Sequence, residues 1–569
     1  MKTLLYAVCI LVVLFTFQVA VQIPSVTASP AIYIRPDGRV DPPTVPIQVI
    51  GNVYTFTNNV YDIIVIQKSN IVIDGAGYVL ESPLEYSRIQ NGNGLDLSEC
   101  SNITVENLEI RNFYRGIILE SSSGNTFSNN RFTSNSIALD VREGSTNTIT
   151  DNTFSANGYA ISFSGGINNV LSGNVMNDNS ASFKIFGSKL NDFQQSIDTS
   201  NLVDGKPVYF LKNQANIAIN PVTHPQVGFL ALINCNDILV EGIEVTKNEP
   251  SLALVNCNNV TIRNVALPND QPTILVSYTD NSIITNNNLL DTRGAHCIRL
   301  LNSSHNIVSN NQIISSFSLY SAYSHGIGIS DGFNNTVFQN LVVGTDSAIC
   351  LLDSDDNTIQ NNSVTNTTTG IEIAGSSGNI VAGNTVFHTI KEYLRYSELG
   401  TGISIDTDAL NNQFYENNIT TNKVGVSLSS SPNTFARNTV ADNELGLSIG
   451  ASNNKIYNNN FLNNIKQAEL ASSSVTLWDN GTAGNYWSDY LTRYPNASEI
   501  NDSGIGDTPY VIDANNIDSY PLMVPYETSP TESKPETEPF PTVLVVAVTV
   551  AVVAVIAVGI LVYFKKGND

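Results

Sequence analysis

Charged residues and cysteines are both scarce in this chain of 569 residues. Only 14% of the residues are charged, and 27 Lys and Arg stand against 51 Asp and Glu, for a net charge of −24. Such a surface repels a phosphate backbone, which excludes nucleic acid as a partner. The 6 cysteines include Cys9 in the apolar leader, and the odd, sparse remainder is no disulfide framework.

Histidine and methionine are scarce too, with 5 and 3 residues and no tract rich in either. Copper carriers use Met, Cys and His as soft or borderline ligands. The composition therefore argues against a protein that binds many copper ions.

Long apolar runs occur only at the two ends of the chain. Lys2 precedes an apolar run over 4–17, and small residues near Ala28 offer a cleavage site, which predicts a secretory signal peptide over 1–28. A first membrane anchor is the alternative.

At the other end, the apolar run predicts a transmembrane helix over 542–564, followed by a cytoplasmic tail with Lys565 and Lys566. The Pro-, Thr- and Glu-rich stretch 527–541 is typical of a disordered stalk. We therefore expect a membrane-tethered protein whose large middle part lies outside the cell.

Asparagine supplies the polarity that charge does not, with 73 residues. The motif Asn-x-(Ile/Val/Phe)-x-x-Asn recurs, mostly at steps of about 22 residues, and begins at Asn125, Asn147, Asn169, Asn259, Asn281, Asn306, Asn335, Asn357, Asn379, Asn412, Asn433 and Asn454. Between copies lies a Gly followed by apolar-x-apolar, as in "GIEI" at Gly370, which indicates a short strand with one buried face.

A unit of this length cannot bury its apolar face alone, but stacked copies can. Propeller blades need about 40 residues, and the leucine-rich phrase is absent. The sequence predicts an all-β, right-handed parallel β-helix over 67–470 with about 15 coils and asparagine ladders. We expect an N-terminal cap over 29–66, a lateral insertion over 183–228 and a capping segment over 471–526.

Three phrases, "VDGKPVYFL" (203–211), "GNYWSDY" (484–490) and "SGIGDTPYVIDANNIDSYPLM" (503–523), together with the repeat, resemble NosD-like β-helix proteins. These belong to the pectin-lyase-like superfold, and many are archaeal surface proteins. The resemblance implies an extracytoplasmic protein of a family labelled copper-binding, some of whose relatives bind or cleave polysaccharides. It carries no fixed set of copper ligands to particular residues.

One candidate metal site follows from aligning the coils by their Gly-apolar strand. Cys297 then takes the place of Gly326, so that His296 and His325 stack on consecutive coils and could share a metal ion such as copper with Cys297. Two exposed imidazoles at a turn are the alternative.

The same alignment places Asp331 and Asp353 just after the strand, with Asp356 beside them. Clustered carboxylates could bind Ca²⁺ or perform acid–base work on a glycan. A solvated acidic corner is the alternative, and the fold alone does not indicate an enzyme.

Two long turns leave the rod at one corner and would wall a groove for a sugar chain. Their aromatic residues are the candidate carbohydrate-binding set: Phe317, Tyr320, Tyr323, Tyr393 and Tyr396. Packing of these rings against each other is the alternative.

Ten sequons fit an extracellular address: Asn102, Asn259, Asn302, Asn334, Asn361, Asn366, Asn418, Asn480, Asn496 and Asn501. Cys235 and Cys257 stand 22 residues apart, which permits either a disulfide between coils or a ladder of buried thiols; we favour the ladder.

The sequence thus predicts a cell-surface binding or scaffold protein whose partners are glycans or surface-layer proteins. A copper-binding accessory protein and a polysaccharide-cleaving hydrolase or lyase are the alternatives.

Overall fold

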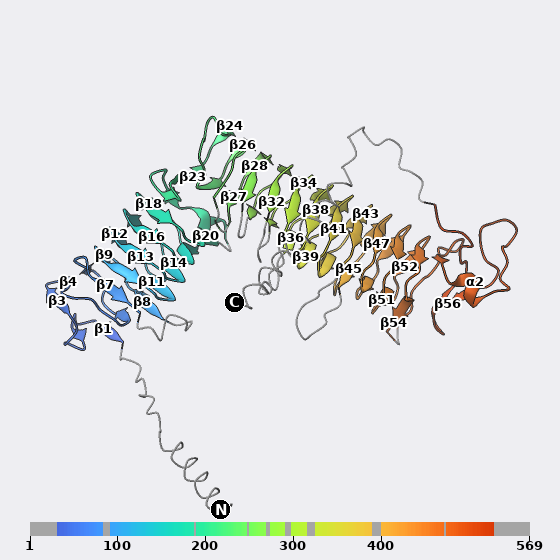
Figure 1. The fold of residues 1–569 in the computed structure, drawn as a ribbon, viewed down its shortest axis with the longest axis horizontal. Coiled ribbons are helices and arrows are strands. Elements are labelled where there is room, and N and C mark those ends of the chain that lie inside the picture. The colour runs from blue at the N-terminus through green and yellow to red at the C-terminus, as the bar shows by residue number, and fades with distance from the viewer. Residues whose placement is uncertain are drawn as a thin grey trace, which may run out of the picture. The chain divides into compact units, whose positions relative to one another are not determined.

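The computed structural model describes residues 31–82, 92–186, 189–246, 248, 250–268, 273–290, 297–315, 325–389, 400–471 and 474–527. These residues form a parallel β-solenoid, in which most turns add one strand to each of three sheets (Figure 1). One ladder runs from β7 (Val79–Glu81) to β54 (Lys466–Leu470) and contains 18 strands. The expected count of about 15 coils was too low, because irregular stretches also contribute strands.

Each turn of the solenoid buries alternate residues of its short strands. One turn consists of β11 (Arg115–Glu120), β12 (Thr126–Ser128) and β13 (Arg131–Thr133). Phe127 of β12 and Phe132 of β13 are fully buried, and they lie in register with Ile149 and Phe154 of the next turn. The apolar face that no single turn could cover is therefore covered by the turns on either side.

Buried asparagines join the turns at the corners between strands. Asn130 is 2% exposed; its Nδ2 donates to the Val105 carbonyl at 2.8 Å and to Asn152 Oδ1 at 3.1 Å. Its Oδ1 accepts the Leu108 amide at 3.1 Å. The preceding Asn129 takes a left-handed backbone (φ 55°), which Asn tolerates better than most residues. One asparagine thus makes the turn and the next satisfies buried backbone groups.

The segment 183–228, expected as a lateral insertion, lies within the sheets of the solenoid. β20 (Ala181–Phe186) and β21 (Ser196–Ile197) end two sheets. The hairpin of β22 (Leu202–Val203) and β23 (Lys206–Lys212) carries the ladder of 18 strands onward to β25 (Phe229–Ile233). New sheets then begin, with β24 (Ala215–Ile219) at the edge of one. The solenoid therefore has two stacks with separate cores, joined through one continuous sheet.

Antiparallel pairs and an aromatic stack cover the ends of the solenoid. At the N-terminal end, β3 (Ile47–Ile50) pairs antiparallel with β4 (Val53–Phe56). At the C-terminal end, Trp487 of β55 (Tyr486–Trp487) stacks on Phe461 at 4.5 Å and on Tyr510 at 4.3 Å. Such caps cover the end turns of the solenoid, whose sheet edges would otherwise pair with other chains.

The expected signal peptide and transmembrane helix lie outside the described residues, as does the expected stalk apart from Glu527. Within the part of the chain that the structure describes, no helix has the length and apolar character needed to cross a membrane.

The ladder of buried asparagines predicts that replacing one of them lowers the free energy of unfolding considerably. Asn130→Ala leaves the Leu108 amide, the Val105 carbonyl and Asn152 Oδ1 without this partner, so we expect a loss of about 2–4 kcal/mol in the free energy of unfolding. Denaturant unfolding measures it. The adjacent exposed control Arg131→Ala should change stability by less than about 0.5 kcal/mol. Equal midpoints for the two variants would contradict the role of the ladder.

Candidate metal centre

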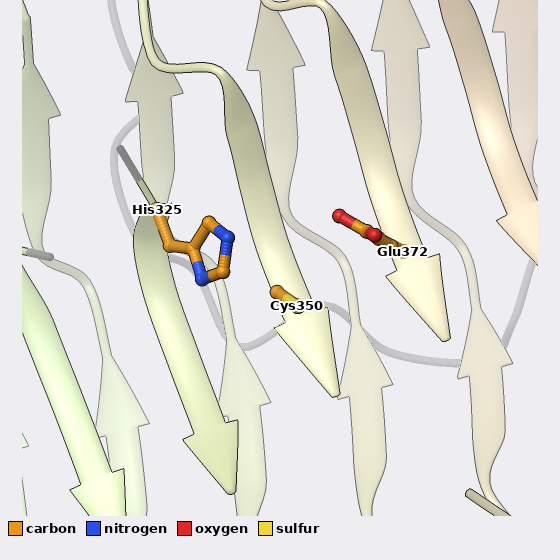
Figure 2. Close-up of side chains that lie close together, drawn as sticks. All are labelled: His325, Cys350 and Glu372. Atoms are coloured by element: carbon orange, nitrogen blue, oxygen red, sulfur yellow. The ribbon is translucent and has the colours of Figure 1, made fainter. Parts of the chain in front are cut away.

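Three side chains able to bind a metal gather on consecutive turns of the long ladder. His325 begins β36 (His325–Ser330), Cys350 lies in β39 (Ser347–Leu352) and Glu372 lies in β42 (Thr369–Ala374). Their ligand atoms, one from each residue, all lie within 4.8 Å of one another. Figure 2 shows the imidazole, thiol and carboxylate on the same side of three neighbouring strands.

Strand register explains why Cys350 and Glu372 meet. Gly328, Cys350 and Glu372 are partners across the ladder, one per turn, while Ile327 and Ile329 alternate with Gly328 and are fully buried in the core. The column of Gly328 therefore faces outward. Because Gly328 has no side chain, it leaves the space beside Cys350 open to the imidazole of His325, which starts the same strand.

The surroundings hold both the imidazole and the thiol in their neutral forms. Burial lowers the pKa of His325 below its usual value, although the carboxylates of Glu372 and Asp346 act in the opposite direction. Burial, followed by the charges of Glu372 and Asp406, raises the pKa of the Cys350 thiol well above its usual range. Cys350 is 6% exposed. A thiol in this state is a poor nucleophile until a cation displaces its proton.

Glu372 is oriented by its neighbour, and one cation lies close by. The Ser347 hydroxyl donates to Glu372 Oε2 at 2.6 Å, which fixes one carboxylate oxygen. Arg299 of β33 (Ile298–Leu301) is the ladder partner of Gly328 and lowers the pKa of His325 through its charge. With the thiol deprotonated, Cys350 and Glu372 would carry two negative charges, which favours a bound cation.

The donor set decides which cations suit the site. Imidazole nitrogen and thiolate sulfur are ligands that copper and zinc prefer, and thiolate favours Cu(I) in particular. Ca²⁺ takes six to eight oxygen ligands, and this cluster offers the two oxygens of Glu372 and the Ser347 hydroxyl. The three residues therefore fit a soft or borderline metal ion and do not fit Ca²⁺.

The sequence identified one of the three ligands. His325 belongs to the cluster, but its expected partner Cys297 has its side chain in the hydrophobic core, fully buried. His296 lies outside the described residues. Cys350 and Glu372 were missed, although they follow Gly328 in the same column at steps of 22 residues. Reading the outward-facing columns of the repeat, in addition to its corners, would have found them.

The candidate catalytic carboxylates lie at exposed turns. Asp331, Asp353 and Asp356 all have left-handed backbones, with φ of 53°, 48° and 55°. Among the described residues, only the cluster of His325, Cys350 and Glu372 brings three potential ligands together. The arrangement agrees with a solvated acidic corner at the end of each strand.

The candidate carbohydrate-binding residues, Phe317, Tyr320, Tyr323, Tyr393 and Tyr396, all lie outside the described residues. The sequons lie on the surface: Asn366 is half-buried and the other nine asparagines are exposed. Their use as glycosylation sites stays a prediction.

The paired cysteines of the core are free thiols. Cys235 and Cys257 are buried on adjacent turns, and Cys257 Sγ donates to the Leu232 carbonyl at 3.3 Å. The Cys257 amide donates to Thr279 Oγ1 at 3.0 Å, and the Thr279 amide donates to Ser303 Oγ at 3.1 Å. In this structure the thiols therefore continue a ladder of hydroxyl groups and form no disulfide.

Two family models match the chain. The model described as "Periplasmic copper-binding protein (NosD)" matches residues 199–398 and 395–492, slightly more than half of the chain. The model described as "Right handed beta helix region" matches residues 46–197. Among curated proteins, none matches.

Solved structures match this chain at low sequence identity. The periplasmic alginate epimerase AlgG is 11% identical, with 75% of this chain and 80% of that chain covered and a TM-score of 0.27. Pectate lyase Pel9A is 15% identical, with 57% and 91% covered and a TM-score of 0.33. DFA-IIIase from Arthrobacter chlorophenolicus A6 is 12% identical, with 64% and 83% covered and a TM-score of 0.29.

Proposed function

This chain belongs to the NosD family of right-handed β-helix proteins, and on that premise we propose that it binds one copper ion outside the cytoplasm through His325, Cys350 and Glu372. The observation that carries the proposal is the convergence of imidazole, thiol and carboxylate within 4.8 Å on three consecutive turns. The scarcity of His and Met elsewhere agrees with a capacity of one ion. Anchoring by the apolar run 542–564 is part of the same proposal.

The donor set fits copper in two respects. The neutral imidazole and the thiolate are both ligands that copper accepts, and the buried position limits the approach of water. Glu372, held by the Ser347 hydroxyl, would supply the third ligand and balance the charge of the cation. Bound copper would supply a soft Lewis acid able to take and release a ligand or an electron.

The roles of the chain's own residues follow from the geometry. The stacked strands fix the backbone of all three residues, whose ligand atoms lie within 4.8 Å of one another, so the three side chains would hold the ion together. Arg299, one turn before His325, adds a positive charge that offsets part of the charge of the thiolate and carboxylate. The site is suited to holding an ion at a fixed place on the solenoid.

Removing a ligand should weaken copper binding. We expect about one Cu(I) per chain, measured under nitrogen by competition with a chromophoric Cu(I) chelator. Cys350→Ser should lower the affinity by about 100-fold or more, and His325→Ala and Glu372→Gln by about 10- to 100-fold, because each removes one donor from a three-donor set.

Matched controls separate this site from other copper ligands. Glu469 occupies the same ladder column as Glu372, four turns later, and Glu469→Gln should leave binding unchanged. Cys257→Ser tests the buried pair of Cys235 and Cys257, and it should also leave copper binding unchanged. Loss of copper in Cys257→Ser, with retention in Cys350→Ser, would overturn the assignment.

Copper affinity should rise with pH. Because burial and nearby carboxylates raise the pKa of Cys350, the thiol stays protonated at neutral pH, and copper must displace one proton. The lowered pKa of His325 means that no further proton leaves the imidazole above about pH 6.5. We expect the dissociation constant to fall about tenfold per pH unit between about pH 6.5 and 8.5. Titrations at several pH values measure this slope, and a flat profile would mean that Cys350 is not a ligand.

A further inference from the structure

A hollow lies at the C-terminal end of the solenoid, between its last turn and the cap. Its volume is about 530 Å³. Lys466 and Gln467 of β54 line it from the solenoid, while Asp489 and Arg493, the latter in α2 (Tyr490–Arg493), line it from the cap. The hollow is remote from the metal cluster in the ladder, since β54 follows β42 by four turns.

The floor of this pocket presents a positioned carboxylate. The Tyr510 hydroxyl donates to both oxygens of Asp489 at 3.1 Å, and Gln467 Nε2 lies 3.4 Å from Asp489 Oδ1. Tyr510 and Gln467 are both buried, which restrains the carboxylate between them. A carboxylate held in this way accepts hydrogen bonds from ligand hydroxyl groups.

The wall of the pocket presents a positioned cation. The Arg493 guanidinium lies over the Tyr510 ring at 4.5 Å and donates to the Val511 carbonyl at 3.0 Å. Lys466 also lines the pocket, but its charge is balanced by Glu469 at 3.2 Å, so Arg493 is the cation left to meet an anionic ligand, within a chain whose net charge is −24. Stacking restrains the planar guanidinium, whose fork of donors matches a carboxylate.

The rim carries an apolar side chain that folding leaves uncovered. Ile465 is 86% exposed, directly before β54, and it lines the pocket. Its neighbours in the lining are polar or charged for the most part. An exposed isoleucine next to hydrogen-bonding groups suits a ligand with both C–H faces and hydroxyl groups.

We propose that this pocket binds an acidic sugar unit of the uronic acid type. Arg493 would pair with the sugar carboxylate, Asp489 would accept hydrogen bonds from ring hydroxyl groups, and Ile465 would pack against the C–H face of a ring. The volume holds about two or three sugar rings. A small inorganic anion would leave Asp489 and Ile465 unused, and a neutral sugar would leave the charge of Arg493 unused. The inference does not depend on the copper site.

Trigalacturonic acid is the probe, and its fully methyl-esterified form is the matched uncharged probe. Isothermal titration calorimetry with the full chain should show binding of the acid trimer and at least tenfold weaker binding of the ester. Arg493→Gln should weaken the acid trimer at least tenfold, since it removes the charged hydrogen bond. Ile465→Ser should weaken it about threefold without altering the fold, because the side chain is exposed.

Arg437→Gln is the control, because Arg437 also lies over a tyrosine ring, at 5.0 Å from Tyr415, but outside the pocket. The affinity of the Arg437→Gln variant for trigalacturonic acid should equal that of the wild type. No heat with the acid trimer, equal binding of acid and ester, or full binding by both Arg493→Gln and Ile465→Ser would overturn the proposal. Ile465→Ser keeps the test decisive if Arg493→Gln loosens the cap.

Discussion

The buried amide ladder is the interaction on which the rest of this structure depends. Each ladder asparagine must meet its counterpart on the next turn, as Asn130 meets Asn152 at 3.1 Å, and it must also reach a backbone carbonyl of the turn before. A corner out of register with the next turn would leave these groups buried without partners, at a cost of about 1–3 kcal/mol each. The ladder therefore keeps the period near 22 residues. Where a turn is longer, the additional residues form a loop between corners whose positions do not change.

A fixed register also superposes the outward-facing residues, and this produces the metal cluster. Cys350 and Glu372 meet because both stand in the column of Gly328, one turn apart, and the missing side chain of Gly328 leaves room for His325. The solenoid thus converts a sequence spacing of 22 residues into contact between side chains. Further along the same column, Ser404 and Ser427 have the same strand backbone but carry no imidazole, thiol or carboxylate.

The sequence predicted the parts of the molecule that repeat and missed those that do not. The strands, the apolar interior and the asparagine corners can be predicted from the spacing alone, because the same sequence pattern recurs in every turn. The path through 183–228 was not predictable in this way, since the hairpin of β22 and β23 occurs once. The alignment of the corners correctly singled out His325. It also singled out Cys297, which aligns with Gly326 on the turn before, but the side chain of Cys297 is buried in the core. Predicting Cys350 and Glu372 requires knowing which residues of each strand face outward, and the corner motif does not give this information.

The central claim is that the metal cluster holds one copper ion, and diffraction from crystals of the copper-loaded protein tests it most directly. Anomalous difference maps calculated from data on either side of the copper absorption edge should show one peak, bounded by the imidazole of His325, the sulfur of Cys350 and the carboxylate of Glu372. A peak elsewhere on the chain, or loaded crystals with no copper peak among these three side chains, would contradict the account.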